Sequence, residues 1–231
     1  MKRLGDTVMS LKTAVRERQK PTLAAEGIWM WSIDYGDGET FFNSYLLQTD
    51  ENESVLIDPF FSTLDGKPAL KWSYFDDLPS PRAVWLTSSD HERDSEHFCK
   101  HFHIPLRASK AESKLLSIAI DEDLKDESIV DGAWKVFCLK EQKTPAECVF
   151  YHTQRQLLLV GDALLSQEDG RLRRPYGEPS YKSEAKAKQG LQFLANLSVK
   201  GILLGHGDPV FKNAQVLLQD ALSLDPRSIA E

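Results

Sequence analysis

Residues 84–93 read VWLTSSDHER, three apolar residues followed at once by polar and charged ones. The apolar residues predict a short buried strand over 83–86, and the polar residues predict a loop where that strand ends. Three further segments show the same change from an apolar strand to a polar loop. They are VLIDP at 55–59, LLVGD at 158–162 and LLGHG at 203–207. Side chains capable of acid–base or metal chemistry therefore stand at the ends of several predicted strands.

The rest of the chain is rich in strands at first and then alternates strands with helices. Two runs of aromatic and branched residues, 28–33 and 41–48, flank a Gly-Asp-Gly sequence at 36–38 and predict a β-hairpin. Helices are predicted over 7–19, 94–102, 182–197 and 216–222. Further strands are predicted over 104–107, 134–139, 148–152, 157–160 and 202–204, and 166–181 is polar and irregular. This order favours sheets covered by helices.

Length and composition predict one soluble domain. The chain has 231 residues, of which 41% are hydrophobic, so we expect a single domain over 1–231 with an N-terminal helical extension over 1–22. The net charge of −7 predicts no nucleic-acid partner, because such partners favour a basic face. Three cysteines without CxxC spacing argue against a disulfide framework. With no secretory signal and no membrane-spanning run, we expect a cytoplasmic protein, and a homo-oligomer is possible.

The segments at the strand ends, taken in order, resemble the motifs of the metallo-β-lactamase superfamily. That family has an Asn-x-Tyr strand before a strand ending in Asp, then Thr-His-x-His-x-Asp-His, then His-Thr-Pro-Gly with Gly-Asp, and finally Gly-His-Gly. The matching segments here are 43–45 with 55–59, 87–93, 143–146 with 161–162, and 205–207. The resemblance covers residues 28–211. It implies an α/β (α+β) fold, a four-layer αββα sandwich, with these loops gathered at one end of the two sheets.

Most metal ligands of the family are replaced in this sequence. Aligned without gaps, four positions of the signature hold other residues. They are Ser88, Asp90, Glu92 and Arg93. A one-residue shift would instead place His91 on the second histidine position, but it would misplace Thr87. Lys143 stands at the histidine position of the third segment, and only Asp162 and His206 are unchanged.

Lys143 and Arg93 argue against a metal centre. Neither an ammonium nor a guanidinium group offers a lone pair to a metal, and each repels a divalent cation. We therefore expect no metal cofactor and a network of salt bridges in its place. Lys143 should lie within hydrogen-bonding reach of Asp162, and Arg93 should approach Asp162 or Glu92.

The sequence is compatible with three functions. A metal-free descendant of the family would bind, or slowly hydrolyse, a small anionic molecule in the ancestral cleft. A mononuclear metallohydrolase would cleave an ester, thioester or lactone with one zinc or iron ion on Asp162 and His206, joined by Asp90, His91 or Glu92. A non-catalytic scaffold would bind partners elsewhere. The candidate catalytic residues are Asp162, His206, Lys143, Asp90 and His91, and the candidate substrate-binding residues are Arg93, Arg173, Arg174 and Tyr176.

Overall fold

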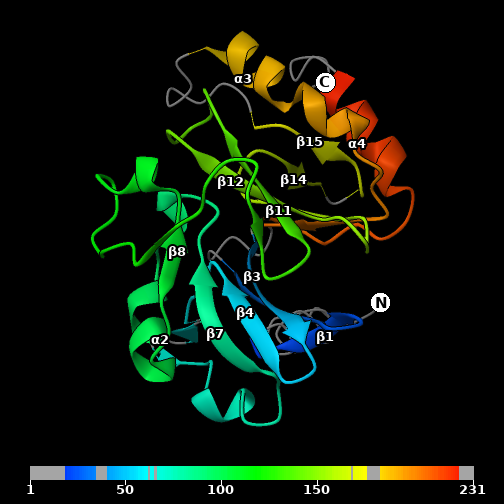
Figure 1. Cartoon of the computed structure of the whole chain (residues 1–231). Coiled ribbons are helices and arrows are strands. Elements are labelled where there is room, and N and C mark those ends of the chain that lie inside the picture. Colours follow the sequence, from blue (N-terminus) through cyan, green and yellow to red (C-terminus); the bar gives the residue numbers. More distant parts are fainter. Residues whose placement is uncertain are drawn as a thin grey trace, which may run out of the picture.

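Two β-sheets face one another in the computed structural model, which describes residues 19–34, 41–61, 63–64, 67–167, 169–175 and 183–223 (Figure 1). The first sheet has the order β1-β2-β3-β4-β7-β8-β9, and the second has the order β10-β11-β12-β13-β16. The strands of the first sheet are β1 (Thr22–Ala25), β2 (Ile28–Asp34), β3 (Phe41–Asp50), β4 (Glu53–Ile57), β7 (Ser80–Trp85), β8 (Leu106–Ala108) and β9 (Glu122–Asp123). Those of the second are β10 (Ile129–Val130), β11 (Trp134–Leu139), β12 (Glu147–His152), β13 (Leu157–Val160) and β16 (Gly201–Leu204).

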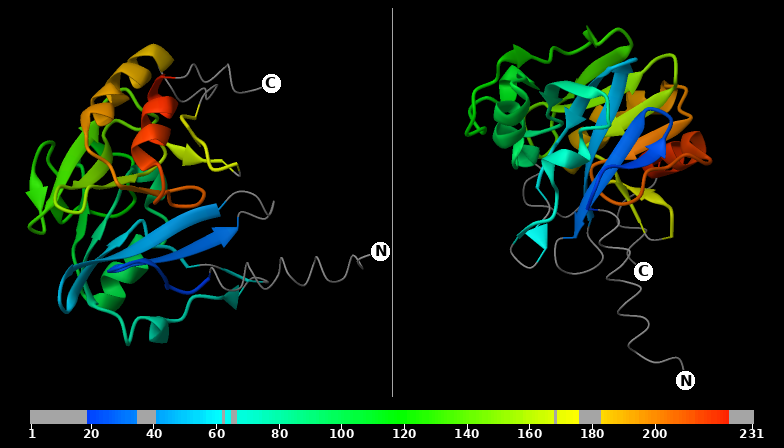
Figure 2. Two further views of the ribbon diagram at one scale, coloured as in Figure 1. Left: turned by 90° about the vertical axis from the view of Figure 1, so that its right-hand side faces the viewer. Right: turned by 90° about the horizontal axis from the view of Figure 1, so that it is seen from below.

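Helices cover the outer faces of both sheets. They are α2 (Ser95–Phe102), α3 (Glu184–Leu191) and α4 (Ala214–Ser223). Short 3-10 turns and two small hairpins complete the described elements. These are η1 (Trp72–Tyr74), η2 (Ser89–His91), η3 (Lys110–Glu112), η4 (Gln192–Asn196), β5 (Thr63–Leu64), β6 (Lys67–Pro68), β14 (Leu165–Ser166) and β15 (Leu172–Arg173). Figure 2 shows α3 and α4 together on the side of the second sheet that faces away from the first.

Three layers of apolar side chains hold the four layers of secondary structure together. The alternation of side chains along β13 explains how one strand serves two of them. Leu157 and Leu159 pack between the two sheets, whereas Leu158 and Val160 pack beneath α3 and α4. A third cluster, which includes Phe98 of α2, covers the outer face of the first sheet. The predicted αββα sandwich is confirmed.

The main predicted elements are present, with differences at the ends. The β2–β3 hairpin pairs antiparallel, with Ile33 opposite Phe42. The helix predicted over 182–197 is shorter than expected, because α3 ends at Leu191 and the chain continues as the tighter turn η4. Gly190 precedes this change, and glycine lowers helix propensity. Part of the stretch predicted to be irregular forms the β14–β15 hairpin. The predicted helix over 7–19 lies, apart from its last residue, outside the described residues.

No helix within the described part of the chain combines the length and the apolar character needed to cross a membrane.

Candidate functional site

Four strand ends bring the polar loops together at one edge of the sandwich. In the first sheet, β4 and β7 run parallel, with Ile57 opposite Trp85, so the loops that follow them leave from the same edge. In the second sheet, β13 and β16 also run parallel, with Val160 opposite Leu204. The backbone N–H of Asn43 donates to the carbonyl of Gly205 at 2.9 Å and joins the two sheets beside this edge.

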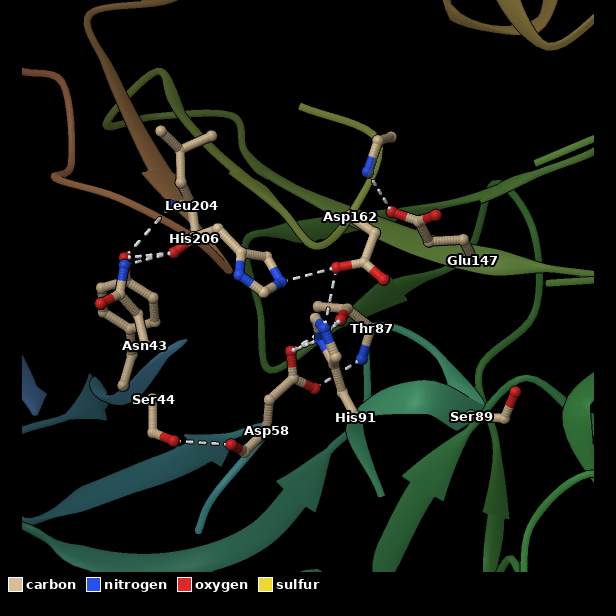
Figure 3. Close-up of polar contacts among 12 residues, drawn as sticks. Asn43, Ser44, Asp58, Thr87, Ser89, His91, Glu147, Asp162, Leu204 and His206 are labelled. Carbon is tan, nitrogen blue, oxygen red and sulfur yellow. Dashed lines mark hydrogen bonds and ion pairs between the residues drawn. The ribbon is translucent and has the colours of Figure 1, made fainter. Parts of the chain in front are cut away.

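Four of the side chains from these loops form one hydrogen-bonded chain (Figure 3). Nδ1 of His91 donates to Oδ2 of Asp58 at 2.8 Å, and Nε2 of His91 donates to Oδ1 of Asp162 at 2.9 Å. Nε2 of His206 donates to the same Oδ1 at 2.8 Å. Asp58, His91 and Asp162 are buried, and His206 is half-buried. Two imidazoles and one carboxylate therefore converge on a single point.

The signature loop reaches the centre through His91. The ungapped alignment places Asp90 on the second histidine position, whereas in the structure His91 contacts Asp162. The cause is the 3-10 turn η2, in which Asp90 is exposed and the next residue is buried. A turn this tight rotates successive side chains by about a third of a circle. Two neighbouring side chains can therefore point in different directions, one into solvent and the next into the interior.

The charges of this chain of residues depend on one another. Burial and the nearby Arg93 guanidinium oppose protonation of His91, but the carboxylates of Asp162 and Asp58 outweigh them and raise the pKa of His91 to about 9. Burial alone would raise the pKa of Asp162, yet His91 and His206 hold it well below its usual range. Burial lowers the pKa of His206 despite its bond to Asp162.

Lys143 lies at the exposed side of this cluster. Its Nζ is 2.8 Å from Oδ2 of Asp90 and 3.7 Å from Oδ2 of Asp162. The expected proximity of Lys143 to Asp162 is therefore present as an ion pair, but the short contact is with Asp90. The side chains of Lys143 and Asp90 are 37% and 42% exposed, so both remain in contact with solvent.

Arg93 does not contact the carboxylates predicted for it. Its guanidinium lies over the rings of Phe42 and Phe60, at 4.8 and 5.3 Å from their centroids. Glu92 instead accepts the backbone N–H of Ser117. The backbone of Arg93 is left-handed, with φ of 41°. This conformation accompanies a side chain that points toward the aromatic rings and not toward the predicted carboxylates. Burial lowers the pKa of Arg93, although Asp58 and Asp162 oppose that shift.

Two buried carboxyl groups of the site were not predicted as functional. Asp58 accepts the backbone N–H of Thr87 at Oδ1 and the Thr87 hydroxyl at Oδ2, besides its bond to His91. Glu147 is fully buried, and Oε1 accepts the N–H of Ala163 at 2.8 Å. Burial and the charge of Asp162 raise the pKa of Glu147 to about 8. Their signal in the sequence was an acidic residue next to an apolar strand.

The remaining predicted residues lie around this centre without joining the chain of hydrogen bonds. Ser88, the extended residue that precedes η2, is buried. Arg173 ends β15, and Arg174 is the buried residue after it. Their hairpin lies beside the last loop, because the N–H of Ser166 in β14 donates to the carbonyl of His206. Tyr176 lies outside the described residues. Substrate binding by the arginines stays a prediction.

The donor set fits one metal ion. Ligand atoms from His91, Asp162 and His206 all lie within 4.8 Å of one another. Two imidazoles and a carboxylate are ordinary zinc ligands, and three protein ligands leave a position open. Asp58 occupies Nδ1 of His91, which is the way metal-binding histidines are commonly oriented. Lys143, which lies beside this set, offers no lone pair to a metal.

Comparisons with known proteins agree with this architecture. A model of the metallo-β-lactamase superfamily matches residues 21–224. No curated protein matches the chain. A metallo-β-lactamase from Pontibacter korlensis is similar in structure, with a TM-score of 0.69 and 15% identity over 89% of this chain and 97% of the other. A metallo-β-lactamase family protein from Thermus thermophilus has a TM-score of 0.66 and 18% identity over 90% of this chain and 81% of the other.

A β-lactamase domain protein from Burkholderia ambifaria is similar as well, with a TM-score of 0.67 and 14% identity over 88% of this chain and 72% of the other. Identities this low show a shared fold and nothing finer. The family model adds the sequence relationship, because it spans nearly all of the described residues. The chain belongs to the metallo-β-lactamase superfamily.

Proposed function

We propose that this chain is a hydrolase that works with one divalent metal ion, held by His91, Asp162 and His206. The observation that carries the proposal is the convergence of both Nε2 atoms on Oδ1 of Asp162. Asp58 supports it, because the bond to Nδ1 leaves Nε2 as the ring nitrogen of His91 that can serve as a ligand. Zinc is the ion that this set of donors suits best.

Lys143 supports a single ion rather than two. Its ammonium lies 3.7 Å from Oδ2 of Asp162, one of the proposed ligands. A positive charge at that distance repels a second cation and can take over part of its electrostatic role. Asp90 holds the ammonium in place at 2.8 Å.

The chemistry divides between the ion and the chain. Zinc with three protein ligands lowers the pKa of a water molecule and polarises a carbonyl or phosphoryl oxygen. Lys143, half-exposed beside the ligands, binds and orients an oxygen of the substrate that carries negative charge. The proposed substrate is therefore a small anionic molecule with an ester, thioester or lactone bond.

A metal titration tests the proposal. Metal-free protein should take up one equivalent of zinc, and its melting temperature should rise, because only the folded state contains the site. His206→Ala should abolish both effects. His97→Ala is the matched control, because its side chain is 67% exposed on α2, away from the ligands. It should bind zinc as the unchanged protein does. Hydrolysis of esters, thioesters and lactones should depend on the bound ion.

An absence of zinc uptake, together with an unchanged melting temperature, would reject the single-ion hydrolase. A second candidate, a metal-free protein that binds a small anion, would then stand. Its supporting observation is that Asp58 and Asp162 each already pair with an imidazole, so the buried carboxylates are compensated without an ion. Stabilisation by small anions, lost in Lys143→Met, would distinguish it from a scaffold with no ligand.

A further inference from the structure

Glu112 is a buried carboxylate that belongs to none of the loops that carry the proposed metal ligands. It is the last residue of η3 and is 1% exposed. Its Oε2 accepts the backbone N–H of Ser89 at 3.0 Å, and its Oε1 accepts the backbone N–H of Ala146 at 2.5 Å. One side chain therefore connects the loop after β7 with the loop before β12.

The first of these bonds acts on the turn that carries His91. Ser89 is the first residue of η2, and the residue before it, Ser88, provides no side-chain cap. The opening N–H groups of a helical turn need partners from outside the turn, and Glu112 supplies one. Because Asp90 and His91 are neighbours on this single turn, its rotation decides which of them faces Asp162.

The second bond acts on the loop that carries Lys143. Ala146 lies between Lys143 and β12, which begins at the next residue. The N–H of Cys148 donates to the carbonyl of Thr87 at 2.6 Å, so the same two loops also meet through their backbones. Glu112 adds a charged acceptor to this junction, and hydrogen bonds to a charged group are stronger than those between neutral groups.

The chemistry of Glu112 favours an orienting role over simple packing. A buried carboxylate loses its hydration, and an apolar residue of similar size would fill the same space without that cost. Only a carboxylate, however, has two acceptor oxygens that can hold two separate N–H groups at once.

We propose that Glu112 is a positioning residue, which fixes the rotation of η2 and thereby aims His91 at the metal position. This inference rests on the proposed function, in which His91 is a metal ligand. Changing residues that orient metal ligands commonly weakens metal binding by ~10–100-fold. Glu112→Gln should weaken cobalt(II) binding to that extent, because the amide of glutamine can accept only one of the two N–H groups.

Cobalt(II) titration, followed by visible absorption well below the melting temperature, provides the measurement. Asp123→Asn is the matched control, because Oδ1 of Asp123 accepts the N–H of Lys110 in the same turn η3 but touches neither site loop. Glu112→Gln should change both the affinity and the absorption spectrum, whereas Asp123→Asn should leave them unchanged. Equal effects of the two variants, or none in Glu112→Gln, would overturn the inference.

Two further measurements separate this inference from the proposed function. If the unchanged protein binds no cobalt(II), the proposed function fails. The NMR signals of the ring N–H groups of His91 in the metal-free protein then test whether Glu112 positions His91. They should disappear in Glu112→Gln and persist in Asp123→Asn, and their persistence in both would reject the positioning role. Should Glu112→Gln not fold, the rate of amide hydrogen exchange in the unchanged protein is measured instead. Rapid exchange of the Ser89 or Ala146 amide would contradict the contact itself.

Discussion

At the scale of single residues, neighbouring side chains have opposite roles in this site. His91 is buried between two carboxylates, whereas the adjacent Asp90 is exposed and pairs with Lys143. Arg93 is two residues further on and stacks on aromatic rings instead of joining the carboxylates. The residue types were visible in the sequence, but their directions follow from the turn η2 and from a left-handed backbone.

Removing the charge of Lys143 should strengthen metal binding. Its Nζ lies 3.7 Å from the proposed ligand Asp162, so it repels a cation bound there. We expect Lys143→Met to bind cobalt(II) several-fold more tightly and to lose hydrolytic activity. Lys100→Met, in an exposed pair with Glu96, should change neither property. The stability cost of Lys143→Met should stay within ~1 kcal/mol, because its pair with Asp90 is exposed. Weaker cobalt(II) binding would show that Lys143 supports the ion instead of opposing it.

Glu147 should make the stability of the metal-free protein fall as the pH rises from acid through the neutral range. Its pKa is about 8 in the folded protein, above the usual value of 4.5, so the folded state holds this proton more tightly than the unfolded chain. Stability is therefore lost as the pH rises from about 4.5 to 8. In Glu147→Gln the side chain cannot ionise. The free energy of unfolding of this variant should therefore rise relative to that of the unchanged protein across that range.

Urea unfolding at a series of pH values measures this difference. The gain in the free energy of unfolding should approach a few kcal/mol at most, as the difference between the two pKa values implies. The neutral amide keeps an acceptor for the N–H of Ala163. Parallel stability curves for the two proteins would mean that Glu147 ionises freely despite its burial.

At the scale of elements, the parallel pairs β4–β7 and β13–β16 explain why the loops converge. Parallel neighbours end at the same edge, so Asp58, His91, Asp162 and His206 follow four strand ends that meet there. Continuous apolar runs allowed these strands to be predicted closely, and β13 has the predicted bounds. The two-residue strands β9 and β10 were missed, because such short segments carry no measurable periodicity.

Gly161 should tolerate no side chain at the end of β13. A Cβ there would lie 2.5 Å from Oγ1 and 2.9 Å from Cβ of Thr87, whose hydroxyl donates to Asp58. We expect Gly161→Ala to destabilise the protein by about 1–3 kcal/mol, as overpacking in a core usually does. The variant should also weaken zinc binding, because Asp58 orients His91. Unfolding in urea and zinc titration measure the two effects. A variant as stable as the unchanged protein would show that the two strand ends can separate freely.

At the scale of the whole molecule, polar contacts close the two sheets at the site edge. The amide of Asn43 in β3 donates to the carbonyls of Leu204 and Gly207 at 2.9 and 2.5 Å. The hydroxyl of Tyr45, on the same strand, donates to the Leu204 carbonyl at 2.7 Å and accepts the Leu204 N–H at 3.1 Å. The Asn-x-Tyr segment therefore has a structural role, since it joins the first sheet to the strand that precedes His206.

Tyr45→Phe should destabilise the whole fold. It would leave the buried N–H of Leu204 without this partner, which costs about 1–3 kcal/mol for a buried unsatisfied group, whereas the Leu204 carbonyl keeps its bond from the Asn43 amide. Tyr151→Phe serves as the control, because its hydroxyl donates only to the carbonyl of Ser198. Denaturant unfolding monitored by fluorescence and by circular dichroism should show the larger loss for Tyr45→Phe. A smaller loss than in the control would mean that the sheets are held together by apolar packing alone.

The sequence by itself determined the family, the layered fold and the two unchanged site residues, Asp162 and His206. These follow from apolar runs and from the order of motifs, which are properties of neighbouring residues along the chain. The tertiary structure alone decided that His91, and not Asp90, contacts Asp162, that Arg93 lies over aromatic rings, and that Glu112 connects two loops. Those outcomes depend on the rotation of one short turn and on contacts between distant segments. Local sequence patterns do not encode such contacts, because packing across the two sheets selects them.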